Sequence, residues 1–260
     1  MKVLAIANHK GGVGKTATAR ALADVLTLAG RRVLLVDSDH QGTLTLSCGL
    51  MNYDGPGLAD VYAVGGRKAA SLADVVQTVG GGLDLAPAGL SLAMAETELI
   101  NRPGREFVLS DALASVAGVY DLVIIDCPPA LGQLVTNALC AADTVLIPTQ
   151  PTPADVAGVA MFLDNIEAVK ANKRLNPRLT LLGVVLTFYD NRLTTHQGGR
   201  AAMLGAGWPV LPVTIPRSVR VAESVAAGQS ITSYEPGSPP AAAYKKLSEM
   251  VQIWLQKNVK

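Results

Sequence analysis

The sequence is short of several kinds of residue, and each shortage narrows the possible classes of protein. Only 17% of the 260 residues are charged and only 4% are aromatic, whereas 49% are hydrophobic. The chain can therefore bury a sizeable core, and we expect residues 1–260 to form one α/β domain. No run of eighteen or more apolar residues occurs, so we expect no membrane span. The net charge of +1 does not by itself indicate a nucleic-acid-binding protein.

Cysteine is also scarce. Cys48, Cys127 and Cys140 form no C-x-x-C pair and lie in apolar or loop contexts. We interpret them as buried structural thiols rather than as metal or redox residues. The first residues have the pattern of a strand and not that of a signal peptide. These features together favour the reducing cytoplasm.

Short aliphatic runs alternate with longer helical patterns along the chain. Such nearly continuous apolar strands suit a parallel sheet buried on both faces. Alternation of strands and helices predicts a three-layer, doubly wound α/β fold with a mostly parallel sheet. We expect the Gly-rich region 52–82 to hold surface helices and loops. The expected strands are 3–8, 32–37, 83–86, 122–126, 144–149, 180–187 and 210–215, and the expected helices are 15–29, 104–117, 134–141, 153–173, 194–206 and 241–257.

The segment between the first strand and the first helix resembles a phosphate-binding loop. The standard pattern G-x-x-x-x-G-K-[ST] needs a glycine five places before Gly14, where this chain has His9. Glycines still allow successive backbone N–H groups to face phosphate oxygens, and the helix N-terminus adds partial positive charge. Lys15 can reach the β- and γ-phosphates, and the Thr16 hydroxyl can ligate Mg²⁺. The predicted loop residues are Lys10, Gly11, Gly12, Val13, Gly14, Lys15, Thr16 and Ala17.

Acidic residues follow two other predicted strands. Asp126 ends an apolar strand, at the edge of the sheet where doubly wound folds bind ligands, and we predict that it supports the metal. Asp37 and Asp39 leave another strand, and the two-residue period places both on one face. One could support Mg²⁺ and the other could orient or deprotonate the attacking water. We assign the metal to Asp37 and the water to Asp39.

Three motifs together resemble the deviant Walker A ATPases of the ParA/MinD superfamily. They are K-G-G-V-G-K-T at 10–16, D-S-D-H-Q-G at 37–42 and I-I-D-C-P-P at 124–129. Two more, L-T-F-Y-D-N-R at 186–192 and I-P-R-S-V-R-V-A-E-S at 215–224, are similar to the ParA branch. The resemblance implies a P-loop NTPase fold of the nitrogenase iron-protein type and a slow, Mg²⁺-dependent ATP hydrolase.

The resemblance also gives a role to the early lysine. In that family the residue matching Lys10 crosses an ATP-bound sandwich dimer and contacts the partner's nucleotide. Such a lysine can neutralise phosphate charge in the transition state, so hydrolysis depends on dimerisation. Two positions depart from the family. Ala17 lacks a hydroxyl expected at the α-phosphate, which is worth about 1 kcal/mol of affinity, and His40 replaces a common proline.

The choice of ATP over GTP rests on the absence of a guanine-binding motif and on the family resemblance. The only near match to the guanine motif N-K-x-D, at 172–175, lacks the aspartate. ATP and Mg²⁺ are therefore the expected cofactors. The resemblance places the adenine near Thr187, Pro216 and Arg217.

The ParA resemblance further implies nonspecific DNA binding by the ATP-bound homodimer. The family's DNA-contact positions correspond to Arg192 and Arg220, and Arg200 and Arg217 could extend the same surface. The alternative is that these are ordinary solvated arginines. A ParB-like centromere-binding protein or an adaptor is the expected stimulating partner, and the expected location is the cytoplasm, on the nucleoid. The chain resembles the short form of the family, without an N-terminal helix-turn-helix.

Two other functions compete with DNA partitioning. A MinD-like membrane-cycling ATPase would use an amphipathic C-terminal helix, and Tyr244, Leu247, Val251 and Trp254 do recur at helical spacing. We favour packing of this helix on the sheet, because MinD-type chains carry a further membrane-targeting extension. A relative of the nitrogenase iron protein would need paired cysteines at a dimer interface, which the spacing does not offer. The cargo, whether plasmid, chromosome, mobile element or protein assembly, stays open.

Overall fold

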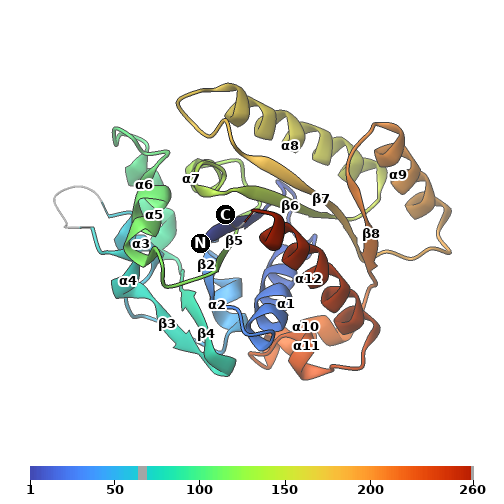
Figure 1. Cartoon of the computed structure of the whole chain (residues 1–260), viewed down its shortest axis with the longest axis horizontal. Coiled ribbons are helices and arrows are strands. Elements are labelled where there is room, and N and C mark those ends of the chain that lie inside the picture. Colours follow the sequence, from blue (N-terminus) through green and yellow to red (C-terminus); the bar gives the residue numbers. More distant parts are fainter. Residues whose placement is uncertain (64–68, 259–260) are drawn as a thin grey trace.

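The computed structural model describes residues 1–63 and 69–258 and contains an eight-stranded sheet between two layers of helices (Figure 1). The strand order is β3-β4-β2-β5-β1-β6-β7-β8, and every neighbouring pair is parallel except the antiparallel β3 and β4. The strands are β1 (Lys2–Ile6), β2 (Val33–Asp37), β3 (Gln77–Val79), β4 (Leu83–Ala86), β5 (Leu122–Asp126), β6 (Thr144–Thr149), β7 (Thr180–Thr187) and β8 (Val210–Ile215).

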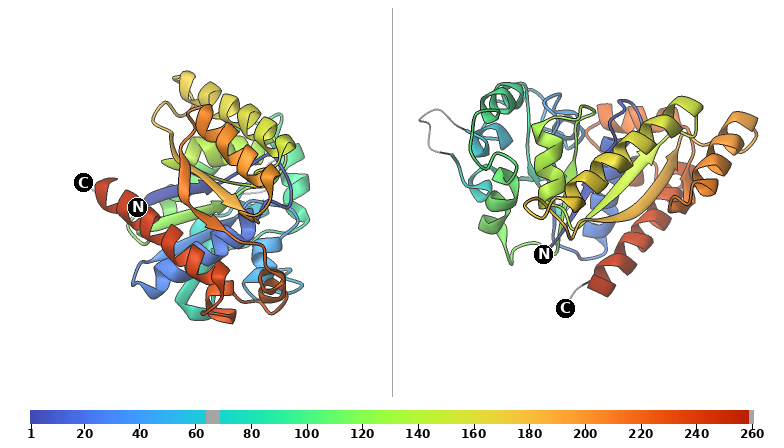
Figure 2. Two further views of the ribbon diagram at one scale, coloured as in Figure 1. Left: turned by 90° about the vertical axis from the view of Figure 1, so that its right-hand side faces the viewer. Right: turned by 90° about the horizontal axis from the view of Figure 1, so that it is seen from above.

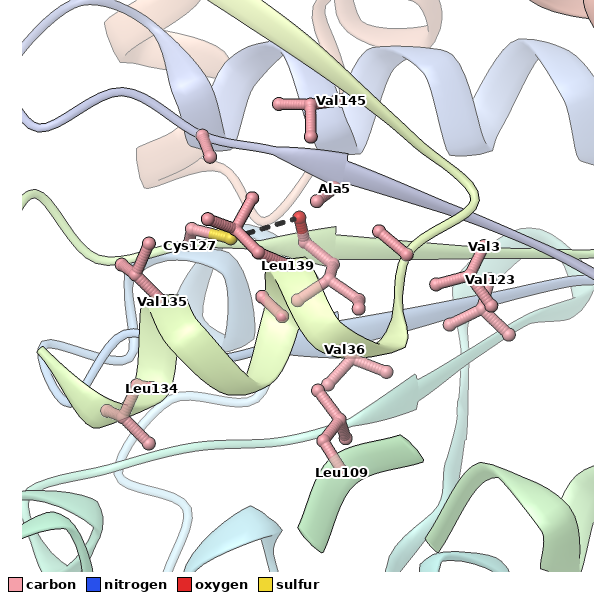
Figure 3. Close-up of a cluster of buried hydrophobic side chains, with 14 of the residues drawn as sticks. Val3, Ala5, Val36, Leu109, Val123, Cys127, Leu134, Val135, Leu139 and Val145 are labelled. Carbon is pink, nitrogen blue, oxygen red and sulfur yellow. Dashed lines mark hydrogen bonds between the residues drawn. The ribbon is translucent and has the colours of Figure 1, made fainter. Parts of the chain in front are cut away.

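The central strands are apolar on both sides because each side meets a layer of helices. Within β1, Val3 and Ala5 belong to one hydrophobic cluster, whereas Leu4 and Ile6 belong to another. Successive side chains of a strand point to opposite faces, so one aliphatic run serves both cores. Figure 3 shows part of the first cluster, where Leu139 and Val135 of a covering helix pack towards the sheet.

The helices divide between the two faces of the sheet. One face is covered by α1, α2, α11 and α12, and the other by α5 to α9 together with the short α3 and α4 (Figures 1 and 2). The helices are α1 (Lys15–Leu28), α2 (Thr43–Ser47), α3 (Leu58–Val61), α4 (Leu72–Val75), α5 (Ser91–Leu99), α6 (Val108–Leu113), α7 (Gln133–Ala141), α8 (Pro153–Ala171), α9 (Thr194–Gly205), α10 (Val219–Ala226), α11 (Ile231–Tyr234) and α12 (Pro239–Asn258), with short 3₁₀ segments η1 (Gly80–Gly82) and η2 (Ala114–Val116).

The predicted doubly wound fold is confirmed, and each predicted strand and helix has a counterpart. The expected helix 104–117 is shorter, because α6 begins at Val108 and ends in η2. The expectation for 52–82 is partly wrong: Leu58 and Leu72 are wholly buried, and β3 extends the sheet there. Residues 64–68 of that region lie outside the described residues.

The C-terminal helix packs on the body of the protein, as the sequence predicted. Tyr244, Leu247 and Val251 are buried against α1 and β8 in the second cluster, and Trp254 packs at its edge. The apolar face of α12 is therefore already covered. None of the helices in the described ranges is long and apolar enough to cross a membrane.

The three cysteines are unbridged, and Cys48 and Cys127 are buried while Cys140 is half-buried. Burial raises the pKa of Cys48 and of Cys140 to about 11, so both thiols stay protonated at neutral pH. The Cys127 thiol points to the carbonyl of Ile125 (Figure 3). These environments fit the structural role predicted for the cysteines.

Candidate nucleotide site

Three neighbouring strands end together and bring the predicted phosphate-site residues to one place. Ile6 of β1 pairs with Asp126 of β5, and Asp126 pairs with Asp37 of β2. All three strands are parallel, so the loops that follow them leave the same edge of the sheet. The phosphate-binding loop therefore begins directly beside both predicted acidic positions.

The loop has the backbone shape that its glycines allow. Gly12 and Gly14 adopt φ values of +70° and +83°, which side chains other than hydrogen rarely tolerate. A Cβ atom added at Gly12 would meet nothing within 4 Å, so open space lies over the loop. Gly14 is the N-cap of the fourteen-residue helix α1 and directs the helix N-terminus to that space.

Lys15 lies within this loop and is 93% buried. Its Nζ donates a 2.9 Å hydrogen bond to the carbonyl oxygen of Lys10. A phosphate oxygen could replace this carbonyl oxygen as the acceptor. Burial lowers the pKa of Lys15, and the nearby Asp126, Cys127 and Asp39 oppose this change. The site thus contains a buried ammonium group whose hydrogen bond to a backbone carbonyl could be replaced by one to a ligand.

Asp126 is the clearest sign that the site fits a cation. The residue is 1% exposed, and neither carboxylate oxygen makes a directed hydrogen bond to any part of the chain that the structure describes. Burial and the neighbouring Asp37 raise its pKa well above the ordinary value, while Thr16 and Lys15 lower it. A buried carboxylate that is this weakly compensated by its neighbours is costly unless it also binds a cation or the water shell of a cation. With the open space over Gly12, the residues present fit Mg²⁺–nucleotide.

Asp37 and Asp39 have different environments. Asp37 is wholly buried, and its oxygens accept hydrogen bonds from the Asp39 N–H at 3.1 Å, the Thr45 N–H at 2.8 Å and the Thr45 hydroxyl at 2.7 Å. These bonds fix the chain after β2, and Oδ1, which accepts only one of them, keeps a free lone pair. A metal contact by Asp37 therefore stays a prediction. Asp39 is only half-buried and lies close enough to Lys15 to influence its pKa. Asp39 is therefore near Lys15, and Asp37 supports the loop that carries Asp39.

The three residues predicted to lie near adenine are not in one environment. The Thr187 hydroxyl donates a 2.9 Å hydrogen bond to the carbonyl of Val13, and Thr187 is 1% exposed. Thr187 therefore supports the backbone of the phosphate-binding loop through this hydrogen bond. Pro216 and Arg217 instead line a hollow of about 660 Å³ between the loops after β7 and β8. Adenine contacts at these positions stay a prediction.

Arg192 and Arg220 are both exposed, at the same edge of the sheet, and each already has an acidic partner. Arg192 makes two hydrogen bonds to Asp190, at 2.9 and 2.7 Å, and these lower the pKa of Asp190 to about 2. Arg220 pairs with Glu223 at 2.7 Å. A DNA phosphate would have to compete with these carboxylates, so exposure alone does not make the two arginines a DNA surface.

Sequence patterns missed several residues that hold the loop in place. The Asn8 amide donates to the carbonyl of Pro148 at 2.9 Å and accepts from the Lys10 N–H at 3.2 Å. The Gln150 amide donates to the carbonyl of Gly12 at 3.4 Å. Asp155 forms an ion pair with Lys10. No motif marks the contacts of these residues with the loop, because their partners come from distant segments.

A phosphate-binding loop on a doubly wound parallel sheet, with acids from two adjacent strands beside it, defines a P-loop nucleotide-binding protein. The family model described as "AAA domain" matches residues 1–181. The chromosome-partitioning ATPase Soj of Thermus thermophilus is 41% identical over 254 residues, which cover 97% of this chain and 96% of that protein. The chromosome partitioning protein ParA of Caulobacter vibrioides is 39% identical over 254 residues, covering 96% and 94%. At this identity and coverage, the chain belongs to the ParA-type ATPases of the AAA-domain family.

A solved structure shares the fold over nearly its whole length. Cobyrinic acid a,c-diamide synthase of Mycobacterium smegmatis superposes with a TM-score of 0.85 at 36% identity, covering 99% of this chain and 97% of that one. That protein was crystallised with ADP and magnesium and also with an ATP analog and magnesium. A chain of this fold can thus hold a magnesium nucleotide.

Proposed function

We propose that the protein is a DNA-partitioning ATPase built as one ATPase domain over residues 1–260. ATP and Mg²⁺ are its cofactors. The observation that carries the proposal is the meeting of Lys15, Asp126 and Asp39 at a glycine-rich loop, in a chain 41% identical to a partitioning ATPase. The cobyrinic acid synthase crystallised with magnesium nucleotides supports the choice of cofactors.

Each residue of the phosphate site has a distinct task in this proposal. The backbone N–H groups of the loop and the N-terminus of α1 bind the phosphates, and Lys15 exchanges the Lys10 carbonyl for a phosphate oxygen. The Thr16 hydroxyl, Asp37 and Asp126 would hold Mg²⁺, which would offset phosphate charge when bound. Asp37 secures the loop that carries Asp39.

Hydrolysis is assigned to Asp39 and to a lysine from the second copy of the chain. Asp39 orients the attacking water. Lys10 crosses to the partner's nucleotide and neutralises charge that develops in the transition state. Turnover is therefore slow and coupled to dimerisation.

The cellular role follows from the partitioning relatives. The ATP-bound dimer binds DNA without sequence preference through Arg192 and Arg220, and a ParB-like protein or adaptor stimulates hydrolysis and resets the cycle. The protein is then expected in the cytoplasm on the nucleoid. The exposure of both arginines supports this surface, although each must exchange its carboxylate partner for a phosphate.

Pelleting with DNA and with anionic liposomes, each with and without ATP–Mg²⁺, tests the role. We expect ATP-dependent pelleting with two unrelated duplexes and none with liposomes. ATP-dependent pelleting with liposomes alone would instead identify a membrane-cycling ATPase of the MinD type. The buried apolar face of α12 is the observation that weighs against that outcome.

Mixed dimers test the assignment of Lys10. Lys10→Ala and Asp39→Ala chains should each be inactive alone. In a mixed dimer, the site that keeps its own Asp39 can receive Lys10 from the other chain, so hydrolysis should partly return. If demonstrably mixed dimers stay inactive, Lys10 works within its own subunit.

A further inference from the structure

The start of helix α8 holds the phosphate-binding loop at three points. Lys10 Nζ lies 2.7 Å from Asp155 Oδ1. The His9 ring lies against Gly158, where an added Cβ would come within 2.4 Å of the ring. Just before the helix, Gln150 bonds the carbonyl of Gly12. The lysine assigned to the partner's active site is therefore bound inside its own subunit.

The two members of the ion pair are unequally exposed. The Asp155 side chain is 0% exposed, whereas that of Lys10 is 43% exposed. The carboxylate is thus a fixed part of the fold, and the ammonium lies at the surface on a flexible stem. Of the two groups, only the lysine can leave without unfolding its surroundings.

The structure also shows why the lysine can leave. The hydroxyl of Thr152, the N-cap of α8, donates a hydrogen bond to Asp155 Oδ2, and the Asp155 N–H points back to that hydroxyl. Asp155 lies in the first turn of a nineteen-residue helix, where partial positive charge stabilises an anion. Oδ1 makes no directed hydrogen bond, so its attraction to Lys10 is mainly between charges. The carboxylate keeps its other stabilisation when Lys10 moves away.

We propose that Asp155 is a positioning residue for Lys10, which it holds within its own subunit until an ATP-bound dimer forms. The inference rests on the proposed function, because it assumes that Lys10 acts across the dimer. Two such pairs must open for each dimer, so Asp155 opposes dimerisation and keeps the unstimulated rate of hydrolysis low. In the assembled dimer it has no further role in the chemical step.

The first test needs no nucleotide and no dimer. Lysine acetylation of the ATP-free protein is measured by mass spectrometry in the parent, in Asp155→Asn and in Asp164→Asn. Asp164 is a matched control, because it is an exposed acid on the same helix. Lys10 should be acetylated up to about fivefold faster in Asp155→Asn, the range for a half-exposed ion pair. The exposed Lys173 is the internal reference and should not change.

The second test measures the consequence for dimerisation. ATP turnover is recorded against protein concentration, and the concentration for half-maximal turnover is compared between variants. In Asp155→Asn it should fall by up to about thirtyfold, since two pairs no longer have to open. The turnover per site at saturating concentration should stay within about twofold. A residue that only supports the fold would raise the half-maximal concentration or lower the maximal rate.

A variant with the opposite expectation covers the case in which Asp155→Asn does not fold. Thr152→Val removes the hydroxyl from Oδ2 but keeps the carboxylate charge, so Lys10 should be held more tightly. Acetylation of Lys10 should slow, and the half-maximal concentration should rise. Thermal melting establishes that each variant is folded.

The outcomes separate this inference from the proposed function. Equal acetylation of Lys10 in the parent and in Asp155→Asn overturns the inference, whatever the protein does with ATP. Faster acetylation with an unchanged half-maximal concentration overturns it as well, because the pair would then not oppose dimerisation. Parent turnover that does not depend on protein concentration refutes the dimer-coupled mechanism, and the inference fails with it.

Discussion

The nucleotide-free protein should become less stable as the pH rises from 5 to 7.5. Burial raises the pKa of Asp37 from 3.8 to about 6, although hydrogen bonds from Thr45 and Asp39 oppose this. Because the folded-state pKa lies above the unfolded value, the contribution to stability is complete below about pH 3.8 and is lost as the pH passes through about 6. The whole effect is about 3 kcal/mol, of which about 1.5 kcal/mol falls between pH 5 and 7.5. Burial raises the pKa of Asp126 in the same direction.

Urea unfolding at several pH values, without nucleotide, measures this effect. The variant Asp126→Asn removes one of the two acids, so its free energy of unfolding should fall less steeply with pH than that of the parent. Asp164→Asn, at an exposed position, should keep the parent's slope. Saturating ATP–Mg²⁺ should remove most of the fall in the parent, because the ionised carboxylates then face a cation. A stability that is constant or rises between pH 5 and 7.5 without nucleotide would refute the reasoning.

Four further substitutions test single contacts. Lys15→Ala should weaken ATP–Mg²⁺ binding by about two orders of magnitude or more, and an unchanged affinity in isothermal titration would contradict its role. Asp39→Ala should keep ATP binding but lose hydrolysis, so that dimer accumulates in size-exclusion chromatography; monomer with normal turnover would exclude this. Thr45→Val should destabilise the protein by about 1.5–3 kcal/mol at pH 7.5 and by less at pH 5, because it removes a hydrogen bond to ionised Asp37; equal losses at both pH values would show that the charge is not involved. Arg220→Ala should flatten the dependence of log DNA affinity on log salt from about −3.6 to about −1.8, measured by fluorescence anisotropy; parental binding would leave Arg220 a solvated residue.

The fold was predictable because its information is local. Each parallel strand is a continuous apolar run, and the helices between them carry their own periodic patterns. Several short elements were missed. The eight-residue α10 does carry a periodic apolar pattern and was overlooked, whereas others have no such signal. β3 has three residues, Gln77–Val79, and pairs antiparallel with β4 at the edge of the sheet. The helix α4 has only four residues, with buried Leu72 and Val75, which is too short for a period to show.

The candidate site also has features that the local sequence predicts and features that it does not. Gly14, Lys15 and Thr16 are adjacent in the sequence, so their spacing carries the chemistry. Asp37 was found as an acid at a strand end, but its engagement by Thr45 depends on how the following loop folds back. The capping pattern at 152–155 could have predicted where α8 begins. It could not have shown that the acid in this pattern faces Lys10.

The position of His9 shows why a motif can be misjudged when it is considered alone. By pattern, His9 is a missing glycine. In the structure the His9 ring packs against α8 at Gly158, where any larger side chain would clash with it. The loop position that lacks a glycine is therefore accommodated by a glycine on the supporting helix. One residue later, Lys10 meets the buried carboxylate of Asp155 on the same helix face. The side chains of residues 9 and 10 are thus positioned by contacts with α8 and not by contacts within the loop. It follows that the start of α8 helps to set the conformation of the phosphate-binding loop, and that the ion pair of Lys10 with Asp155 must open if Lys10 is to reach a second subunit.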